Sequence, residues 1–172
     1  MKKRIVVVCP GRGSYVKETL GYLRQYGAHV GGFIRDIDQR RQAVGEPTIT
    51  ELDYAEIFQV ALHTRGEHAS PLIYACAYAD FMAIDRERFE IVAVTGNSMG
   101  WYLTCAFAGA LDWAGGFDVI NTMGSMMKET IVGGQVIYPV CDENWRMSEE
   151  RWQTVDEAVT PARARDKDIE IY

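Results

Sequence analysis

The residues of this sequence whose types and spacing could do covalent chemistry are Gly96-Asn97-Ser98-Met99-Gly100. The β-branched run 89–94 precedes this pattern and the apolar run 101–110 follows it, an order that predicts strand, tight turn and helix. Such a turn strains the serine backbone, so the residues two positions to either side must be small, as Gly96 and Gly100 are. The pattern predicts a nucleophilic Ser98, with an idle serine in a glycine-bounded turn as the alternative.

A second glycine-rich turn, Pro10-Gly11-Arg12-Gly13-Ser14, follows the first apolar run at residues 4–9. Both turns are expected at the carboxyl ends of parallel strands, where ligands of α/β proteins gather. Backbone N–H groups of this turn and of Met99 could together form an oxyanion hole. A phosphate-binding loop is disfavoured because the lysine and the third glycine of such loops are absent. A plain strand–helix connection remains the alternative.

A serine nucleophile needs a general base, and no histidine follows Ser98 in the sequence, where the base is usually found. In α/β-hydrolases the acid and the histidine follow the nucleophile, whereas His29, His63 and His68 all precede Ser98. Either His68 acts out of order or the base lies outside this chain. The alternative for His63 and His68 is that they are polar loop residues.

Composition limits the class of protein. The 172 residues are 48% hydrophobic and 24% charged, which is typical of one soluble globular domain. A net charge of −6 argues against nucleic acid or an anionic membrane as the main partner. No run reaches the roughly 18 apolar residues that a membrane-spanning helix needs. Together with cysteines that are widely scattered and lack a C-x-x-C pair, these features predict a cytoplasmic protein.

The cysteines and the clustered arginines are predicted to have no catalytic or ligand-binding role. The four cysteines lack metal-ligand spacing, so no metal site is expected and reduced, mostly buried thiols are predicted at Cys9, Cys76, Cys105 and Cys141. Arg35, Arg40 and Arg41 share their segment with aspartates, which predicts a solvated helix face.

Strands and helices are expected to alternate along the chain, which indicates an α/β fold with a parallel sheet. Between residues 28 and 60 we expect short helices and loops, with Thr50 as an N-cap. Pro71 is expected as the first residue of a buried helix capped by Ser70. After residue 142 the sequence is polar, with Trp145 and Trp152 as anchors. The remaining elements are predicted as strands at 4–9, 89–94 and 135–140 and helices at 14–26, 70–84, 101–110 and 116–129.

These motifs resemble the acyltransferase family of malonyl-CoA:acyl carrier protein transacylases. Residues 10–14 are similar to the family's Pro-Gly-Gln-Gly-Ser start, and residues 96–102 to its nucleophile signature Gly-His-Ser-Leu-Gly-Glu-Tyr. Residues 108–112 match its Ala-Gly-Ala-Leu segment, and residues 123–127 its Arg-Gly-x-x-Met stretch. The resemblance covers residues 4 to about 140, with the motifs in the family's order.

The resemblance implies an α/β-hydrolase-like parallel sheet with a nucleophile elbow and an inserted ferredoxin-like small subdomain. Residues 1–134 would form the N-terminal part of the large subdomain, and residues 135–172 the start of the small subdomain or a truncated tail. The family's catalytic histidine follows the insertion, so the resemblance also implies that this chain ends before it.

The implied activity is acyl transfer from acyl-CoA to acyl carrier protein through an acyl-enzyme at Ser98. The backbone N–H groups of Arg12 and Met99 would hold the oxyanion. Acyl-CoA and acyl carrier protein would be the partners, with acyl-CoA as substrate and no bound cofactor. The alternatives are a serine esterase or patatin-like hydrolase, and a non-catalytic degenerate acyltransferase that binds carrier protein.

Substrate binding is assigned by the same resemblance to Gly11, His68 and Met123. Met123 stands where malonyl-using members place an arginine against the substrate carboxylate. Methionine offers soft apolar contact in place of a bidentate ion pair. The substrate is therefore malonyl-CoA or, given Met123, a neutral acyl-CoA.

Overall fold

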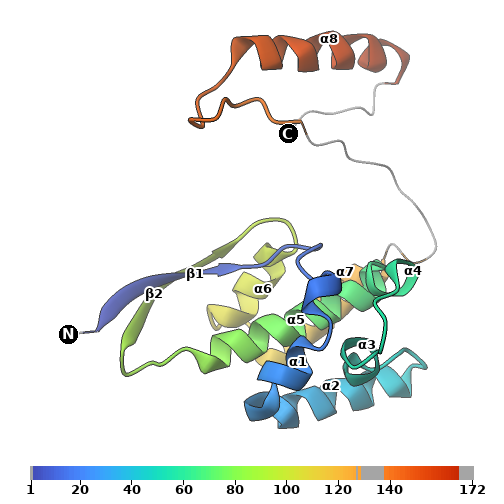
Figure 1. Cartoon of the computed structure of the whole chain (residues 1–172), viewed down its shortest axis with the longest axis vertical. Helices are drawn as coiled ribbons and strands as arrows, with labels where there is room; N and C mark the ends of the chain where they lie inside the picture. The colour runs from blue at the N-terminus through green and yellow to red at the C-terminus, as the bar shows by residue number, and fades with distance from the viewer. Residues whose placement is uncertain (1, 127, 129–137, 167–172) are drawn as a thin grey trace. The chain divides into compact units, whose positions relative to one another are not determined.

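The computed structural model describes residues 2–126, 128 and 138–166, and the chain divides into two compact units, residues 1–132 and 133–172. Helices and a small parallel sheet make up the first unit, and a hairpin-like bridge and one helix make up the second (Figure 1). No helix among the described residues has the length and apolar character to cross a membrane.

The sheet joins β1 (Lys3–Cys9) to β2 (Phe89–Gly96) in parallel. Lys3 lies opposite Phe89 and Cys9 opposite Gly96, with one irregularity in register between Ile5 and Val6. The strands predicted at 4–9 and 89–94 and the parallel sheet are therefore confirmed. This pairing brings the two glycine-rich turns, which begin directly after Cys9 and at Gly96, to the same end of the sheet.

Six short helical elements follow β1, and their bounds differ from those expected. The helix predicted over 14–26 is interrupted because Gly21 has a left-handed φ of 83°. Thr48, not Thr50, caps the third α-helix, with its hydroxyl 3.0 Å from the Glu51 N–H nitrogen. A helix of 13 residues was missed between 28 and 60. The elements are η1 (Lys17–Thr19), α1 (Tyr22–Tyr26), η2 (Ala28–Val30), α2 (Gly31–Ala43), α3 (Ile49–Asp53) and α4 (Val60–His63).

Helix α5 (Gly66–Ala83) is the central element of the first unit, and its residues 67–75 are all buried. It begins at Gly66, so Ser70 and Pro71 lie within the helix and not at its cap. Proline cannot donate to the carbonyl four residues earlier, which here is that of Glu67. The buried Arg41 supplies the missing donor, with its Nη1 3.0 Å from the Glu67 carbonyl oxygen. The prediction that Arg41 lies on a solvated face is therefore wrong.

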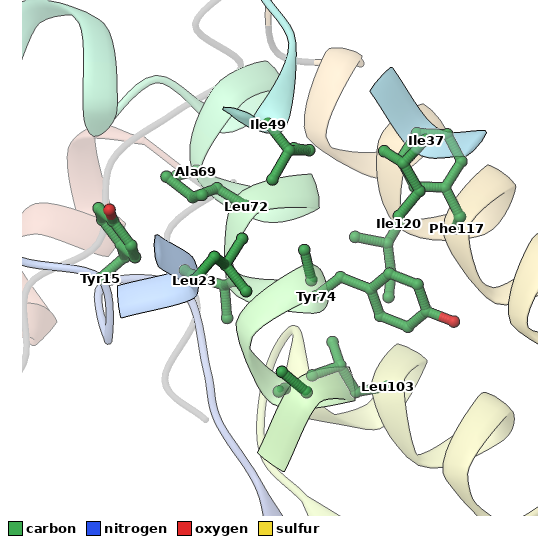
Figure 2. Packing of buried hydrophobic residues seen from close by; sticks show 14 of the residues in the cluster. Tyr15, Leu23, Ile37, Ile49, Ala69, Leu72, Tyr74, Leu103, Phe117 and Ile120 are labelled. Carbon is green, nitrogen blue, oxygen red and sulfur yellow. The ribbon is translucent and has the colours of Figure 1, made fainter. Parts of the chain in front are cut away.

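Helices α6 (Gly100–Phe107) and α7 (Trp113–Ser125) complete the first unit. Asp112 caps α7 by accepting the Gly115 N–H at 2.7 Å, so this helix begins three residues before the predicted start. Residues of α2, α3, α5, α6 and α7 meet in one apolar core, which Figure 2 shows around Ile37, Ile49, Leu72, Tyr74, Leu103, Phe117 and Ile120.

In the second unit, an antiparallel bridge joins Cys141 to Met147, and Ser148 caps helix α8 (Glu149–Arg165). No described residue of α8 is buried, and Trp145 and Trp152 are exposed, so they do not anchor a core among the described residues. Of the strand predicted over 135–140, residues 135–137 lie outside the described residues, and residues 138–140 are described but form no strand. All four cysteines are free, but Cys9 alone is buried, which corrects the expectation of mostly buried thiols.

Candidate active site

Ser98 lies in the turn between β2, which ends at Gly96, and α6, which begins at Gly100. Its φ is 53°, a left-handed conformation that side chains other than glycine rarely adopt. Among the described residues other than glycine, only Trp145 also has a positive φ. Backbone strain of this kind costs about 1–3 kcal/mol and is concentrated at functional sites.

Two glycines make this turn sterically possible. A Cβ at Gly96 would lie 2.5 Å from the carbonyl oxygen of Gly100. A Cβ at Gly100 would lie 2.7 Å from the carbonyl oxygen of Cys9, at the end of the neighbouring strand. Both distances are far below van der Waals contact with backbone atoms that cannot rotate away. The predicted need for small residues on either side of Ser98 is confirmed.

The first glycine-rich turn lies against the Ser98 turn. A Cβ at Gly11 would be 3.5 Å from the carbonyl oxygen of Asn97, an ordinary contact distance. Gly13 has a φ of 102°, which requires glycine, and the Ser14 N–H donates to the Gly11 carbonyl at 3.4 Å. The pairing of β1 with β2 thus brings together two turns that are more than 80 residues apart in the sequence.

A cavity of about 370 Å³ opens at Ser98. Four predicted site residues line it, namely Ser98, Arg12, Met99 and Met123, whereas Gly11 and His68 are not among its lining residues. Sequence reasoning missed the other four, which are Ser70, Trp101, Tyr102 and Gly124. The motif at residues 123–127 was a signal for Gly124, whereas Ser70, predicted as a helix cap, lies within α5.

The wall formed by Ser70 and Gly124 depends on a close approach of α5 and α7. A Cβ at Gly124 would lie 2.5 Å from the Gly66 carbonyl oxygen and 3.0 Å from the Ser70 Oγ. Nη1 of Arg12 comes within 3.3 Å of the corresponding Cβ position at Gly66. The guanidinium of Arg12 therefore reaches the start of α5, at the edge of the cavity.

All three histidines face backbone carbonyls. His29 Nε2 is 2.9 Å from the Ala79 oxygen, and His63 lies fully buried with its two ring nitrogens 3.0 and 2.9 Å from the Gln59 and Leu52 oxygens. His68 is buried too, with Nδ1 3.0 Å from the Leu62 oxygen. The reading of His63 and His68 as polar loop residues is therefore wrong. Burial lowers the pKa of His68, which favours its neutral form.

The described residues that line the cavity include one charged side chain, Arg12, and no histidine, aspartate or glutamate. Ser98 therefore has no general base among them. No group of histidine, cysteine, aspartate and glutamate side chains in the described part of the chain is arranged to hold a metal ion.

Comparisons with known proteins find likeness at the level of structure. Neither the protein-family models nor the curated proteins give a match. The malonyl-CoA:ACP transacylase of Synechocystis sp. matches with a TM-score of 0.53 and 19% identity, over 74% of this chain and 40% of that one. The malonyl-CoA:acyl carrier protein transacylase of Clostridium perfringens matches with a TM-score of 0.60 and 19% identity, over 94% of this chain and 48% of that one.

The acyl-carrier-protein S-malonyltransferase of Bartonella henselae matches with a TM-score of 0.63 and 16% identity, over 93% of this chain and 49% of that one. The chain thus spans less than half the length of each of these three structures. The resemblance found in the motifs is confirmed in three dimensions: this chain has the fold of malonyl-CoA:acyl carrier protein transacylases over that span.

Proposed function

We propose that this chain carries the nucleophile and the oxyanion-binding side of an acyltransferase site. The observation that carries the proposal is the left-handed Ser98 at the end of a parallel strand, in one cavity with Arg12 and Met99. In this proposal the turn at Ser98 is a nucleophile elbow. Unsatisfied N–H groups at the start of a helix favour negative charge, and Met99 stands directly before α6.

The proposed reaction has two steps. Ser98 Oγ attacks the thioester carbonyl of acyl-CoA, and the N–H groups of Arg12 and Met99 hold the resulting oxyanion. The C–S bond then breaks, leaving an acyl ester on Ser98, and the serine proton passes through a base to the departing CoA sulfur. In the second step the phosphopantetheine thiol of acyl carrier protein attacks this ester, and Ser98 regains its proton.

The base in this proposal is supplied from outside the described residues. None of the three histidines lines the cavity, and His68, the candidate from sequence, faces Leu62. General-base assistance is worth about 10²–10⁴ in rate. Residues 1–172 alone are therefore expected to acylate slowly and to respond to an added base.

The proposed acyl group is neutral. Met123 lines the cavity together with Trp101 and Tyr102, which gives the substrate pocket apolar walls. The named similar proteins act on malonyl-CoA, which bears a carboxylate. In this chain the position that the family resemblance assigns to that carboxylate is held by a thioether, which cannot pair with it.

A second candidate function is that of a non-catalytic, degenerate acyltransferase that still binds carrier protein. The lack of a histidine or carboxylate among the described cavity residues favours it. The left-handed backbone of Ser98 argues against this second function. Such a conformation destabilises the fold, and a turn without a functional role would have no reason to keep it.

Acyl-enzyme mapping tests the proposal. Purified chain is incubated with acetyl-CoA or malonyl-CoA, with and without imidazole as the added base, and the adduct is located by peptide mass spectrometry. We expect an acyl group on Ser98 that forms faster with imidazole, disappears in Ser98→Ala and persists in Ser70→Ala, which changes the other serine of the cavity. Acylation of Ser70 or of a cysteine, or no adduct under any condition, would refute the proposed nucleophile.

A further inference from the structure

The cavity at Ser98 has polar side chains that the proposed reaction does not use. Most of the described side chains that line it are apolar or aromatic, namely Met99, Trp101, Tyr102 and Met123. Apart from Ser98 itself, the exceptions are the hydroxyl of Ser70 and the guanidinium of Arg12. Ligand pockets are commonly apolar with a few convergent polar groups, and those groups orient the ligand and decide which ligand fits. Ser70 and Arg12 are therefore candidates for choosing the acyl group.

These two polar groups come to the same place, the crossing of α5 and α7. Nη1 of Arg12 lies 3.3 Å from the position that a Cβ would take at Gly66, the first residue of α5. Ser70 Oγ lies 3.0 Å from the corresponding position at Gly124 of α7, where the Gly66 carbonyl oxygen is 2.5 Å away. Gly66 and Ser70 are four residues apart on α5, so they lie on one face of the helix. The hydroxyl and the guanidinium therefore meet around Gly66 and form one polar wall of the cavity.

The chemistry of this wall selects for a hydrogen-bond acceptor. Ser70 is only 3% exposed, and a buried hydroxyl is normally hydrogen-bonded, so a ligand atom at this wall is expected to pair with it. The guanidinium of Arg12 can only donate, and the hydroxyl of Ser70 can donate as well. A ketone oxygen has two lone pairs and can accept from both groups at once. A methylene group at the same place would leave both donors without a ligand partner.

We propose that the acyl group preferred by the Ser98 site is a short 3-oxoacyl group, whose C3 carbonyl oxygen accepts hydrogen bonds from Ser70 and Arg12. This proposal rests on the proposed acylation of Ser98 and narrows its neutral acyl group to one class. A volume of about 370 Å³ is near the lower end for ligand pockets, so the acceptor must lie within a few bonds of the thioester carbonyl. C3 is the nearest carbon that is not bonded to that carbonyl.

The covalent step is the one proposed for Ser98. The ester between Ser98 Oγ and the acyl carbon forms, the C–S bond breaks, and the serine proton passes through the base to the CoA sulfur. Ser70 and Arg12 form and break no covalent bond in this step. Their side chains hold the C3 oxygen and so orient the thioester carbonyl toward Ser98.

Acetoacetyl-CoA and butyryl-CoA are a matched pair of probes, because they differ only in a carbonyl or a methylene group at C3. The 172-residue chain is incubated with an equimolar mixture of the two and imidazole as the added base, and mass spectrometry of the Ser98 peptide gives the ratio of the two esters. We expect the ratio of acetoacetyl to butyryl ester to fall about tenfold in Ser70→Ala and in Arg12→Met, the effect of one lost hydrogen bond. The intrinsic reactivity of each thioester is the same for every variant, so it cancels in this comparison.

Ser125→Ala is the matched control. It also removes a buried hydroxyl oxygen, directly after Gly124 in α7, but Ser125 does not line the cavity. The ratio of the two esters should therefore stay as it is in the original chain. Arg12→Met keeps the backbone N–H that is proposed for the oxyanion hole, so its effect on the ratio reports the guanidinium alone. Circular dichroism checks that each variant is folded.

Binding without reaction separates this proposal from the proposed reaction. Ser98→Ala cannot form the ester, so isothermal titration calorimetry of this variant measures the affinity for each thioester alone. Acetoacetyl-CoA should bind about tenfold more tightly than butyryl-CoA, and adding Ser70→Ala should remove the difference.

The outcomes are distinct. If Ser98 is acylated but the two affinities are equal, the 3-oxoacyl preference is overturned and the reaction stands. If the affinities differ as expected but Ser98 is never acylated, the reaction is overturned and the preference stands. An equal fall of the ester ratio in Ser125→Ala would also overturn the preference. So would tighter binding of malonyl-CoA than of acetoacetyl-CoA, which would assign the polar wall to a carboxylate.

Discussion

Arg41 donates a hydrogen bond of 3.0 Å to the carbonyl oxygen of Glu67, the acceptor that Pro71 leaves without an N–H partner in α5. The same guanidinium donates to the Pro47 carbonyl at 2.6 Å and to the Asn121 side chain at 2.8 Å, and pairs with Glu46 at 3.0 Å. One cation thus ties α2 to α5 and α7. A proline in the middle of the central helix is tolerated because a side chain from a different helix, far from it in the sequence, compensates for the lost hydrogen bond.

We expect Arg41→Met to lower the free energy of unfolding by about 3–5 kcal/mol, the range found when one partner of a buried ion pair is removed. Urea denaturation measures this loss. Arg35→Met is the control, because Arg35 is exposed on the same helix and should change stability by no more than about 0.5 kcal/mol. In a Pro71→Ala background the loss should be smaller, since an alanine at this position can donate its N–H to the Glu67 carbonyl. Equal losses in the two backgrounds would show that Arg41 does not compensate for Pro71.

At the Ser98 turn, Gly96→Ala and Gly100→Ala should each destabilise the fold by about 1–3 kcal/mol or more, the usual cost of forcing an atom into a filled space. Their Cβ atoms would lie 2.5 and 2.7 Å from backbone oxygens. Gly32→Ala, in α2, serves as the control, because its nearest atom is 4.0 Å away at the end of an arginine, and alanine favours helix. Thermal melts compare the three variants, and an unchanged Gly96→Ala would contradict the steric account.

The sequence predicted four of the eight residues that line the Ser98 cavity, and three of these, Arg12, Ser98 and Met99, lie in turns that directly follow strands. Once β1 and β2 are parallel neighbours, the turns holding Arg12 and Ser98 must meet, and local patterns suffice to find both strands. Ser70 was missed for a local reason. Serine before proline is typical of a helix start, yet α5 begins one turn earlier, and this places Ser70 within the helix and against the cavity.

Arg41 and helix α2 were misjudged for a different reason. The acceptors of Arg41 lie on Pro47, Glu67 and Asn121, and nothing in the neighbourhood of Arg41 in the sequence points to them. Two glycines at the start of α2 and its many charges also hide the helix, since only Ile37 and Arg41 on it are buried. Whether a charged side chain is buried depends on which distant segments pack around it, and hydrophobic periodicity along the sequence does not show this.

Two tyrosine–aspartate hydrogen bonds, one buried and one exposed, allow the effect of burial on the cost of losing the tyrosine hydroxyl to be measured. Tyr15 donates to Asp53 at 2.6 Å in the buried core, and Tyr22 donates to the exposed Asp80 at 2.7 Å. We expect Tyr15→Phe to cost about 1.5–3 kcal/mol, because it leaves a buried carboxylate oxygen unpaired. Tyr22→Phe should cost less than about 1 kcal/mol, because water replaces the lost donor. Equal costs in urea denaturation would contradict this difference.

His68 should make stability depend on pH. Its burial lowers the pKa in the folded state, so the unfolded chain, with an ordinary pKa near 6.5, binds the proton more readily. The contribution of His68 is therefore complete above about pH 6.5 and is lost as the pH falls toward the folded-state pKa. His68→Gln should flatten the dependence of the unfolding free energy on pH between about 7.5 and 5. If the unfolding free energy of His68→Gln changes with pH as steeply as that of the original chain, His68 is not the source of the pH dependence.

Acyl selectivity tests the apolar character assigned to the Ser98 cavity. Acetyl-CoA should acylate Ser98 in preference to malonyl-CoA, because Met123 cannot pair with a carboxylate, and an unpaired buried charge costs several kcal/mol. Met123→Arg should shift the ratio toward malonyl-CoA, whereas Met126→Arg, an exposed site on the same segment that does not line the cavity, should leave it unchanged. Competition between the two thioesters, read by mass spectrometry of the Ser98 peptide, gives the ratio. Arg12 also lines this cavity and could pair with a carboxylate. If the original chain already prefers malonyl-CoA and Arg12→Gln removes that preference, the role of Met123 is refuted. Recognition of the carboxylate is then assigned to Arg12.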